Sequence, residues 1–126
     1  MLAGIYNIHI EQGSTYSLNL TWKDDAGNPI DLTGYEARMK VRKSYSGPVV
    51  LSLTSDSGIV LGGALGTIDV TATALETSQI ALDLATLTNN DGKPCQQMVW
   101  DIELEIAGVV TRILQGSAFI YPEATR

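Results

Sequence analysis

Two side chains in the sequence, His9 and Cys95, are of types that are common in catalysis, and each is the single residue of its kind. A catalytic histidine needs a carboxylate to orient it and a nucleophile beside it, and a reactive cysteine usually lies within a recognisable motif. Neither pattern surrounds these residues. We therefore expect His9 to be a surface or interface side chain and Cys95 to be an inert thiol in a loop, and we predict that the chain is not an enzyme.

Oxygen-bearing side chains are grouped at Asp24, Asp25, Asn28 and Asp31. Their spacing does not match a calcium-binding loop, which needs a glycine at its sixth position and a glutamate at its twelfth. Asp and Asn are also turn residues, because their side chains hydrogen-bond to nearby backbone amides. We expect a turn here, and neither a metal ion nor a cofactor.

The chain has 126 residues, and its 14 Asp and Glu outnumber its 8 Lys and Arg, which gives a net charge of −6. This length fits a single domain over residues 1–126. The acidic balance gives no electrostatic reason to bind nucleic acid or an anionic membrane. No apolar run approaches the ~20 residues that span a bilayer, and no signal peptide is evident. We expect synthesis in the cytoplasm and no small-molecule ligand.

Apolar and polar residues alternate along much of the chain, which is the period of β-strands. The alternation is clearest at residues 98–106. It recurs before the turn segments at Gly27 and Gly47 and after Gly66. Ala107 and Gly108 predict a hairpin turn. The spacing predicts an all-β fold, an immunoglobulin-like antiparallel β-sandwich of about seven to nine strands with at most one short helical turn, near residues 75–78.

A change of phase on the last predicted strand, around Gln115 and Gly116, predicts a β-bulge. Trp22 and Trp100 lie on the apolar phases of their strands, so we expect both to be core residues rather than platforms for a sugar.

Charged residues give a further clue to strand order. Arg38, Lys40 and Arg42 share one face of a predicted strand, and acidic residues alternate along residues 101–105 on one face of another. Opposite charges on neighbouring strands contribute about 0.2–1 kcal/mol per pair. We therefore predict that these two strands are neighbours in one sheet. The alternative is that the basic residues bind phosphate or an acidic partner.

A longer pattern covers most of the chain and includes Asp-Leu-Thr-Gly at residues 31–34 between a turn and a charged strand. The segments that carry it are residues 13–20, 25–42, 66–68, 99–104, 108–116 and 121–126. This pattern resembles small structural proteins of tailed bacteriophages and is similar to the N-terminal β-sandwich domain of their upper baseplate proteins. In those proteins a long region follows this domain, whereas the present sequence ends at Arg126.

The resemblance implies a non-enzymatic structural component of a virion, most plainly a tail, baseplate or neck protein that anchors fibres or other receptor-binding parts. Its partners would be other virion proteins and copies of itself in a symmetric assembly, and its location the virion. The alternatives are a capsid decoration (cement) protein, or a carbohydrate-binding adhesion module. The adhesion module would need exposed aromatic side chains, for which Tyr35, Tyr45 and Tyr121 are the candidates.

Assembly contacts are expected from strand edges, charged side chains and both ends of the chain. An assembly arm at residues 1–12 and a short tail at residues 122–126 are the expected terminal contacts. The individual candidates are Tyr6, Ile8, Ile10, Arg38, Lys40, Arg42, Tyr121 and Arg126.

Overall fold

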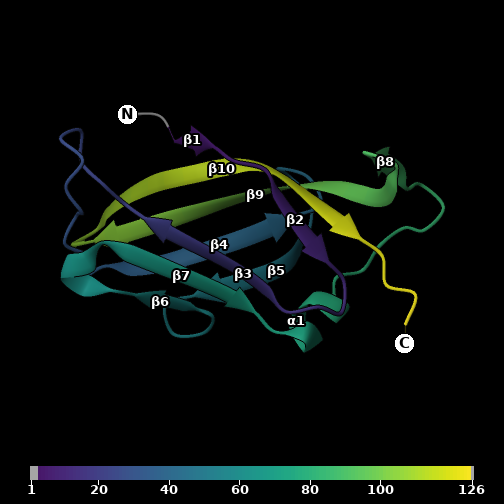
Figure 1. Ribbon diagram of the computed structural model, residues 1–126, viewed down its shortest axis with the longest axis horizontal. Coiled ribbons are helices and arrows are strands. Elements are labelled where there is room, and N and C mark those ends of the chain that lie inside the picture. Colours follow the sequence, from purple (N-terminus) through teal and green to yellow (C-terminus); the bar gives the residue numbers. More distant parts are fainter. Residues whose placement is uncertain (1–2, 126) are drawn as a thin grey trace.

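The computed structural model describes residues 3–125, and in that range the chain forms two β-sheets packed face to face (Figure 1). The larger sheet has the order β1/β2–β10–β9–β4–β5, and the smaller has the order β3–β7–β6. The strands of the larger sheet are β1 (Gly4–Ile5), β2 (Ile8–Glu11), β10 (Val109–Tyr121), β9 (Lys93–Ile106), β4 (Glu36–Arg42) and β5 (Val49–Thr54). Those of the smaller sheet are β3 (Tyr16–Thr21), β7 (Thr67–Ala72) and β6 (Ile59–Leu61).

Three short elements complete the fold, and the first of them is a further strand of the larger sheet. Strand β8 (Thr88–Asn90) pairs with the start of β9. The helical turn α1 (Ala74–Ser78) follows β7 and begins at a capping box, in which the side chains of Thr73 and Glu76 each bond the other's backbone amide. The predicted helical turn is therefore confirmed, and a second turn, the 3-10 helix η1 (Gly63–Leu65), was not predicted.

This strand order defines an immunoglobulin-like sandwich of the variable type, in which the larger sheet gains a strand at its edge. The predicted all-β fold class is thus confirmed. Among the named strands, β1 and β2 run parallel to β10, and the other pairings are antiparallel. The hairpin between β9 and β10 turns at Ala107 and Gly108, as predicted, and both residues have positive φ angles.

Strand β9 lies between β10 and β4, and its side chains divide cleanly between the two faces of the sheet. The inward residues Met98, Trp100, Ile102 and Leu104 are at most 2% exposed. They pack against Ile68 and the other inward side chains of the smaller sheet to form one core. Because side chains on a strand alternate between faces, the acidic residues between them must point to solvent.

The structure corrects three local expectations from the sequence. The irregularity in β10 lies between Arg112 and Leu114, earlier than predicted, so residues 115 and 116 pair regularly with β9. Cys95 is fully buried on β9 rather than placed in a loop. Of the two tryptophans, Trp100 is 2% exposed, whereas Trp22 is only partly buried at the margin of the core.

The N-terminal segment is fixed to the larger sheet by close backbone contact. The indole Nε1 of Trp100 donates a hydrogen bond of 2.8 Å to the backbone oxygen of Tyr6. Gly116 allows this approach, because a Cβ atom at that position would lie 2.3 Å from the same oxygen. Farther along, the buried side chain of Gln12 donates to the backbone oxygen of Ile80 and accepts from the backbone amide of Glu123, each over 2.9–3.0 Å.

Tyr16 gives the fold a measurable response to alkaline pH. Burial, followed by the nearby Tyr6, raises the pKa of the Tyr16 phenol from 10.0 to about 12. Because the folded state holds this proton more tightly than the unfolded chain does, the contribution is intact below pH 10 and is lost as pH rises toward 12. We expect Tyr16→Phe to flatten the fall in the free energy of unfolding over that interval in denaturant titrations. An unchanged slope would contradict the assignment.

The solvent face of the larger sheet as the candidate functional site

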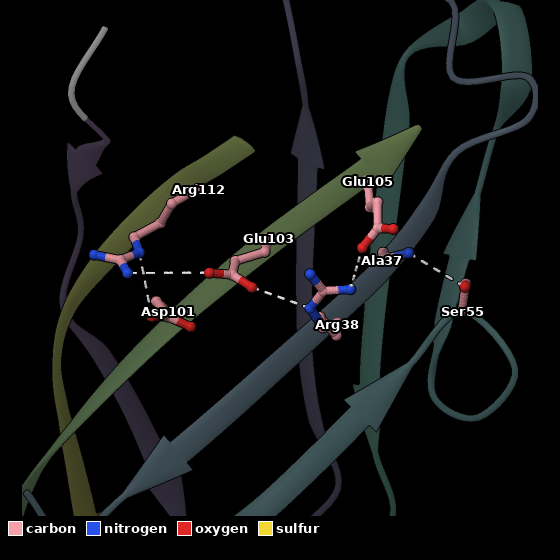
Figure 2. Close-up of polar contacts among 7 residues, drawn as sticks. All are labelled: Ala37, Arg38, Ser55, Asp101, Glu103, Glu105 and Arg112. Carbon is pink, nitrogen blue, oxygen red and sulfur yellow. Dashed lines mark hydrogen bonds and ion pairs between the residues drawn. The ribbon is translucent and has the colours of Figure 1, made fainter. Parts of the chain in front are cut away.

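The solvent face of β4, β9 and β10 carries a row of ion pairs (Figure 2). The Nε atom of Arg38 lies 3.0 Å from a carboxylate oxygen of Glu103, and its Nη1 lies 2.9 Å from Glu105. From β10, Arg112 lies 3.3 Å from Asp101 and 4.0 Å from the other oxygen of Glu103. The prediction that β4 and β9 are neighbours is confirmed by their register, which places Arg38 opposite Glu103.

The ionisation of these groups follows from their contacts. Hydrogen bonds to Glu105 and Glu103 raise the pKa of the Arg38 guanidinium, which keeps this side chain charged. Burial raises the pKa of the Asp101 carboxyl above its usual value, although Arg112 acts in the opposite direction. The surroundings of Asp101 therefore disfavour its charged form.

Reversing the charge of Arg38 tests whether the row stabilises the fold. Arg38→Glu places like charges beside Glu103 and Glu105, so we expect the free energy of unfolding to fall by about 1 kcal/mol, less at high salt. Lys43→Glu is the matched control, since it makes the same charge change at an exposed loop position. Equal effects from the two variants in urea titrations would mean that net charge, and not the row, determines stability.

The other two basic side chains of β4, Lys40 and Arg42, have different surroundings from Arg38. Lys40 is exposed opposite Asp101, and the Nη1 of Arg42 donates to the backbone oxygen of Gly47 over 3.0 Å. Together with Tyr45, which is 76% exposed, they line a shallow hollow of about 210 Å³. All three basic side chains that the sequence grouped as one strip border this hollow, and among them Arg38 is also paired with Glu103 and Glu105.

A group of aromatic side chains lies on the same solvent face, across β9 from this hollow, on β2 and β10. The parallel pairing of these strands places His9 directly beside Phe119. The His9 ring stacks on Phe119 with centroids 5.3 Å apart and on Tyr121 with centroids 5.9 Å apart. Strand β8 lies at the same end of the sheet, next to the end of β10 (Figure 1), and it contributes Asn90.

The Tyr121 hydroxyl is the centre of the polar contacts in this group. It accepts a hydrogen bond of 2.8 Å from Nδ2 of Asn90 and lies 2.8 Å from Nδ1 of His9. A phenol has one proton to donate, so a hydroxyl that accepts from Asn90 can donate that proton to His9 Nδ1. In the neutral tautomer that accepts this proton, the Nε2 atom of His9 carries the ring proton and is the nitrogen left to donate to a ligand.

These residues border a hollow of about 420 Å³. Its lining combines the Tyr121 and His9 rings with the polar side chains of Asn90, Asp91 and Glu11, and adds Lys93, Pro94 and Pro122. This size and this mixture of aromatic surface with convergent polar groups are typical of sites that bind small molecules. Six of the eight lining residues carry side chains that can form hydrogen bonds.

The structure separates the residues proposed as assembly contacts. Ile8 and Ile10 are 1% and 0% exposed, so their side chains belong to the core and cannot form surface contacts. Tyr6 is 49% exposed on the link between β1 and β2. Tyr121 lines the aromatic hollow. Arg126 lies outside the described residues.

Three functional side chains were not predicted as a group: His9, Asn90 and Phe119. His9 was expected only to be on the surface, and no local pattern links it to the last strand. The signal that was available is the outward phase of Phe119 and Tyr121, which puts two aromatic side chains on one solvent face. Of the aromatics expected to be exposed, Tyr35 instead packs edge to face on Trp22, with ring centroids 5.9 Å apart.

Neither residue with catalytic potential is paired for catalysis among residues 3–125. The ring nitrogen of His9 contacts a tyrosine hydroxyl, and Cys95 is fully buried. In the same part of the chain, no three His, Cys, Asp or Glu side chains are grouped so that they could hold a metal ion. None of the helices there is long and apolar enough to cross a membrane.

Comparison with known proteins does not identify a family. No family model and no curated protein matches the sequence. One similar solved structure is a parallel homodimer of the extracellular domains of the voltage-gated sodium channel beta4 subunit, with a TM-score of 0.45, 9% identity, and coverage of 98% of this chain and 96% of that one. Another comes from work on multimeric cell-adhesive interactions of sodium channel beta subunits, with a TM-score of 0.43, 10% identity, and coverage of 94% and 92%. Likeness of this degree concerns the immunoglobulin-like fold alone.

The expected function as a structural part of a phage virion is contradicted by these findings. The similar structures are immunoglobulin-like extracellular adhesion domains rather than phage baseplate proteins, and no matching family or curated protein supports the phage interpretation. The residues that carried the resemblance have local structural roles. The carboxylate of Asp31 accepts hydrogen bonds from the amide and hydroxyl of Thr33, and Gly34 has a φ of +85°. This motif builds a turn.

Proposed function

We propose that the chain is a non-catalytic adhesion module that binds carbohydrate at the hollow lined by Tyr121, His9 and Asn90. The observation that carries this proposal is the Tyr121 hydroxyl, held between an amide and an imidazole at the border of an open hollow. An aromatic ring with a polar tip suits a ligand that has both C–H faces and hydroxyl groups. Asp91 and Glu11 add carboxylate acceptors for such hydroxyls.

Self-association belongs to the same proposal. A shallow site on a sheet face binds a single sugar weakly, and linking several copies raises overall avidity without any new contact. The beta4 domain occurs as a parallel homodimer. In this chain, Ile5 is 80% exposed and Tyr6 is 49% exposed at the edge of the larger sheet, which offers apolar surface to a second copy. We expect sedimentation velocity to detect an oligomer whose population falls in an Ile5→Ser, Tyr6→Ser double variant.

The carbohydrate proposal is tested by screening the protein on a glycan array and then titrating the best glycan. Tyr121→Ala removes the ring and should weaken binding at least about tenfold, while Tyr121→Phe removes only the hydroxyl and should give an intermediate loss. Tyr45→Ala is the matched control, because Tyr45 is an exposed tyrosine that lines the other hollow. Absence of any glycan hit, or equal binding by wild type and Tyr121→Ala, would overturn the proposal.

A further inference from the structure

One strand position of the smaller sheet is empty among the described residues. In immunoglobulin domains, the strand that precedes the equivalent of β3 can lie beside it in the same sheet. Here both strands that precede β3 pair instead with β10 in the larger sheet. Within residues 3–125, β3 pairs only with β7, so its other side is a sheet edge.

The hydrogen-bonding groups on this edge are identified by the register of the β3–β7 ladder. The amide of Trp22 donates to the backbone oxygen of Gly66 over 2.9 Å, on the β7 side. Residues of an antiparallel strand alternate between bonding to the partner and pointing away from it. The amides and carbonyls of Ser17, Asn19 and Thr21 therefore point to the open edge.

An apolar hollow of about 320 Å³ lies beside the same edge. Its lining includes side chains from both sheets: Tyr6, Leu20, Thr21, Trp22, Ile68, Ile113 and Leu114. Because Ile113 and Leu114 belong to β10, the inner surface of the larger sheet extends past β3 and is left partly uncovered. A strand placed beside β3 would cover these side chains.

This edge lacks the features with which proteins usually block strand addition. Residues 16–22 include no charged residue and no proline, although the chain as a whole is acidic. Other edges are less suitable. Strand β6 has three residues, and β5 follows Pro48 and pairs with β4 through an irregular register. Short strands, prolines and bulges all disfavour pairing with another chain.

We propose that the open edge of β3 binds one extended strand from another polypeptide, uncharged and with apolar side chains at alternate positions. The edge supplies three pairs of backbone groups, and the hollow takes the apolar side chains of alternate residues. Two intact copies cannot pair through their β3 strands. The two-fold axis relating the two strands would place both larger sheets on the same side of the joined smaller sheets, where they would overlap. The occupant is therefore a single strand.

A synthetic peptide with the sequence of residues 16–22, blocked at both ends, is a suitable probe. The peptide can pair antiparallel with β3 so that the two Asn19 residues lie opposite each other. Its backbone groups then align with those of Ser17 and Thr21, and its leucines lie opposite the leucines of β3 over the hollow. We expect amide hydrogen exchange, followed by NMR, to be fast at Ser17, Asn19 and Thr21 in the free protein and slowed by the peptide. The same peptide with lysine in place of its two leucines should have no effect.

Two substitutions separate edge pairing from other modes of binding. Asn19→Pro removes an outward amide and leaves the bonds from β3 to β7 intact, so it should weaken peptide binding at least about tenfold. Asn19→Lys adds a charge at the edge and should act similarly, whereas Thr71→Lys adds it on the central strand of the same sheet and should not. Slow exchange of the three amides in the free protein, absence of peptide protection, or equal binding by these variants would overturn the proposal.

Discussion

The register of β9 is the constraint on which the rest of the structure depends. This strand pairs with β10 on one side and β4 on the other, and its buried residues alternate with Asp101, Glu103 and Glu105. A slip of one residue would turn three carboxylates into the core and four large apolar side chains into water. The penalty for burying unpaired charge makes that alternative inaccessible. The position of every other strand in the larger sheet follows from this one choice.

The same constraint determines what the solvent face can bind. With β9 fixed, the outward residues of β10 are also fixed, and the parallel pairing of β2 then places His9 beside Phe119. Most of the charge on the face is neutralised within the sheet through Arg38 and Arg112. The parts of the face left to contact a ligand are therefore the two regions on either side of β9, one basic around Lys40 and one aromatic around Tyr121.

The parts of the fold that sequence alone predicted are those encoded by local period or by charge. Alternation identified the strands, and opposite charge identified β4 and β9 as neighbours. The pairing of β2 with β10 could not be predicted from the sequence, because a contact between residues 8–11 and 118–121 leaves no local pattern. Ile8 and Ile10 were taken as contact residues for that reason, although they are core. Of the residues around the aromatic hollow, Tyr121 was predicted as a contact residue. The position of His9 beside it depends on the pairing of β2 with β10, which was not predicted.

The parallel arrangement of β2 and β10 also has a mechanical consequence. The described N-terminal and C-terminal ends of the chain lie at opposite ends of the molecule (Figure 1). The elements nearest to them are β1, which precedes β2 and also runs parallel to β10, and β10 itself. A force that pulls the two ends apart therefore acts along the strands, and it loads the pairs from Ile8–Ala118 to Glu11–Tyr121 in shear. Hydrogen bonds loaded in this way must break together, whereas those of a hairpin pulled open at its ends break one at a time. The domain is therefore expected to resist unfolding when a force pulls its two ends apart.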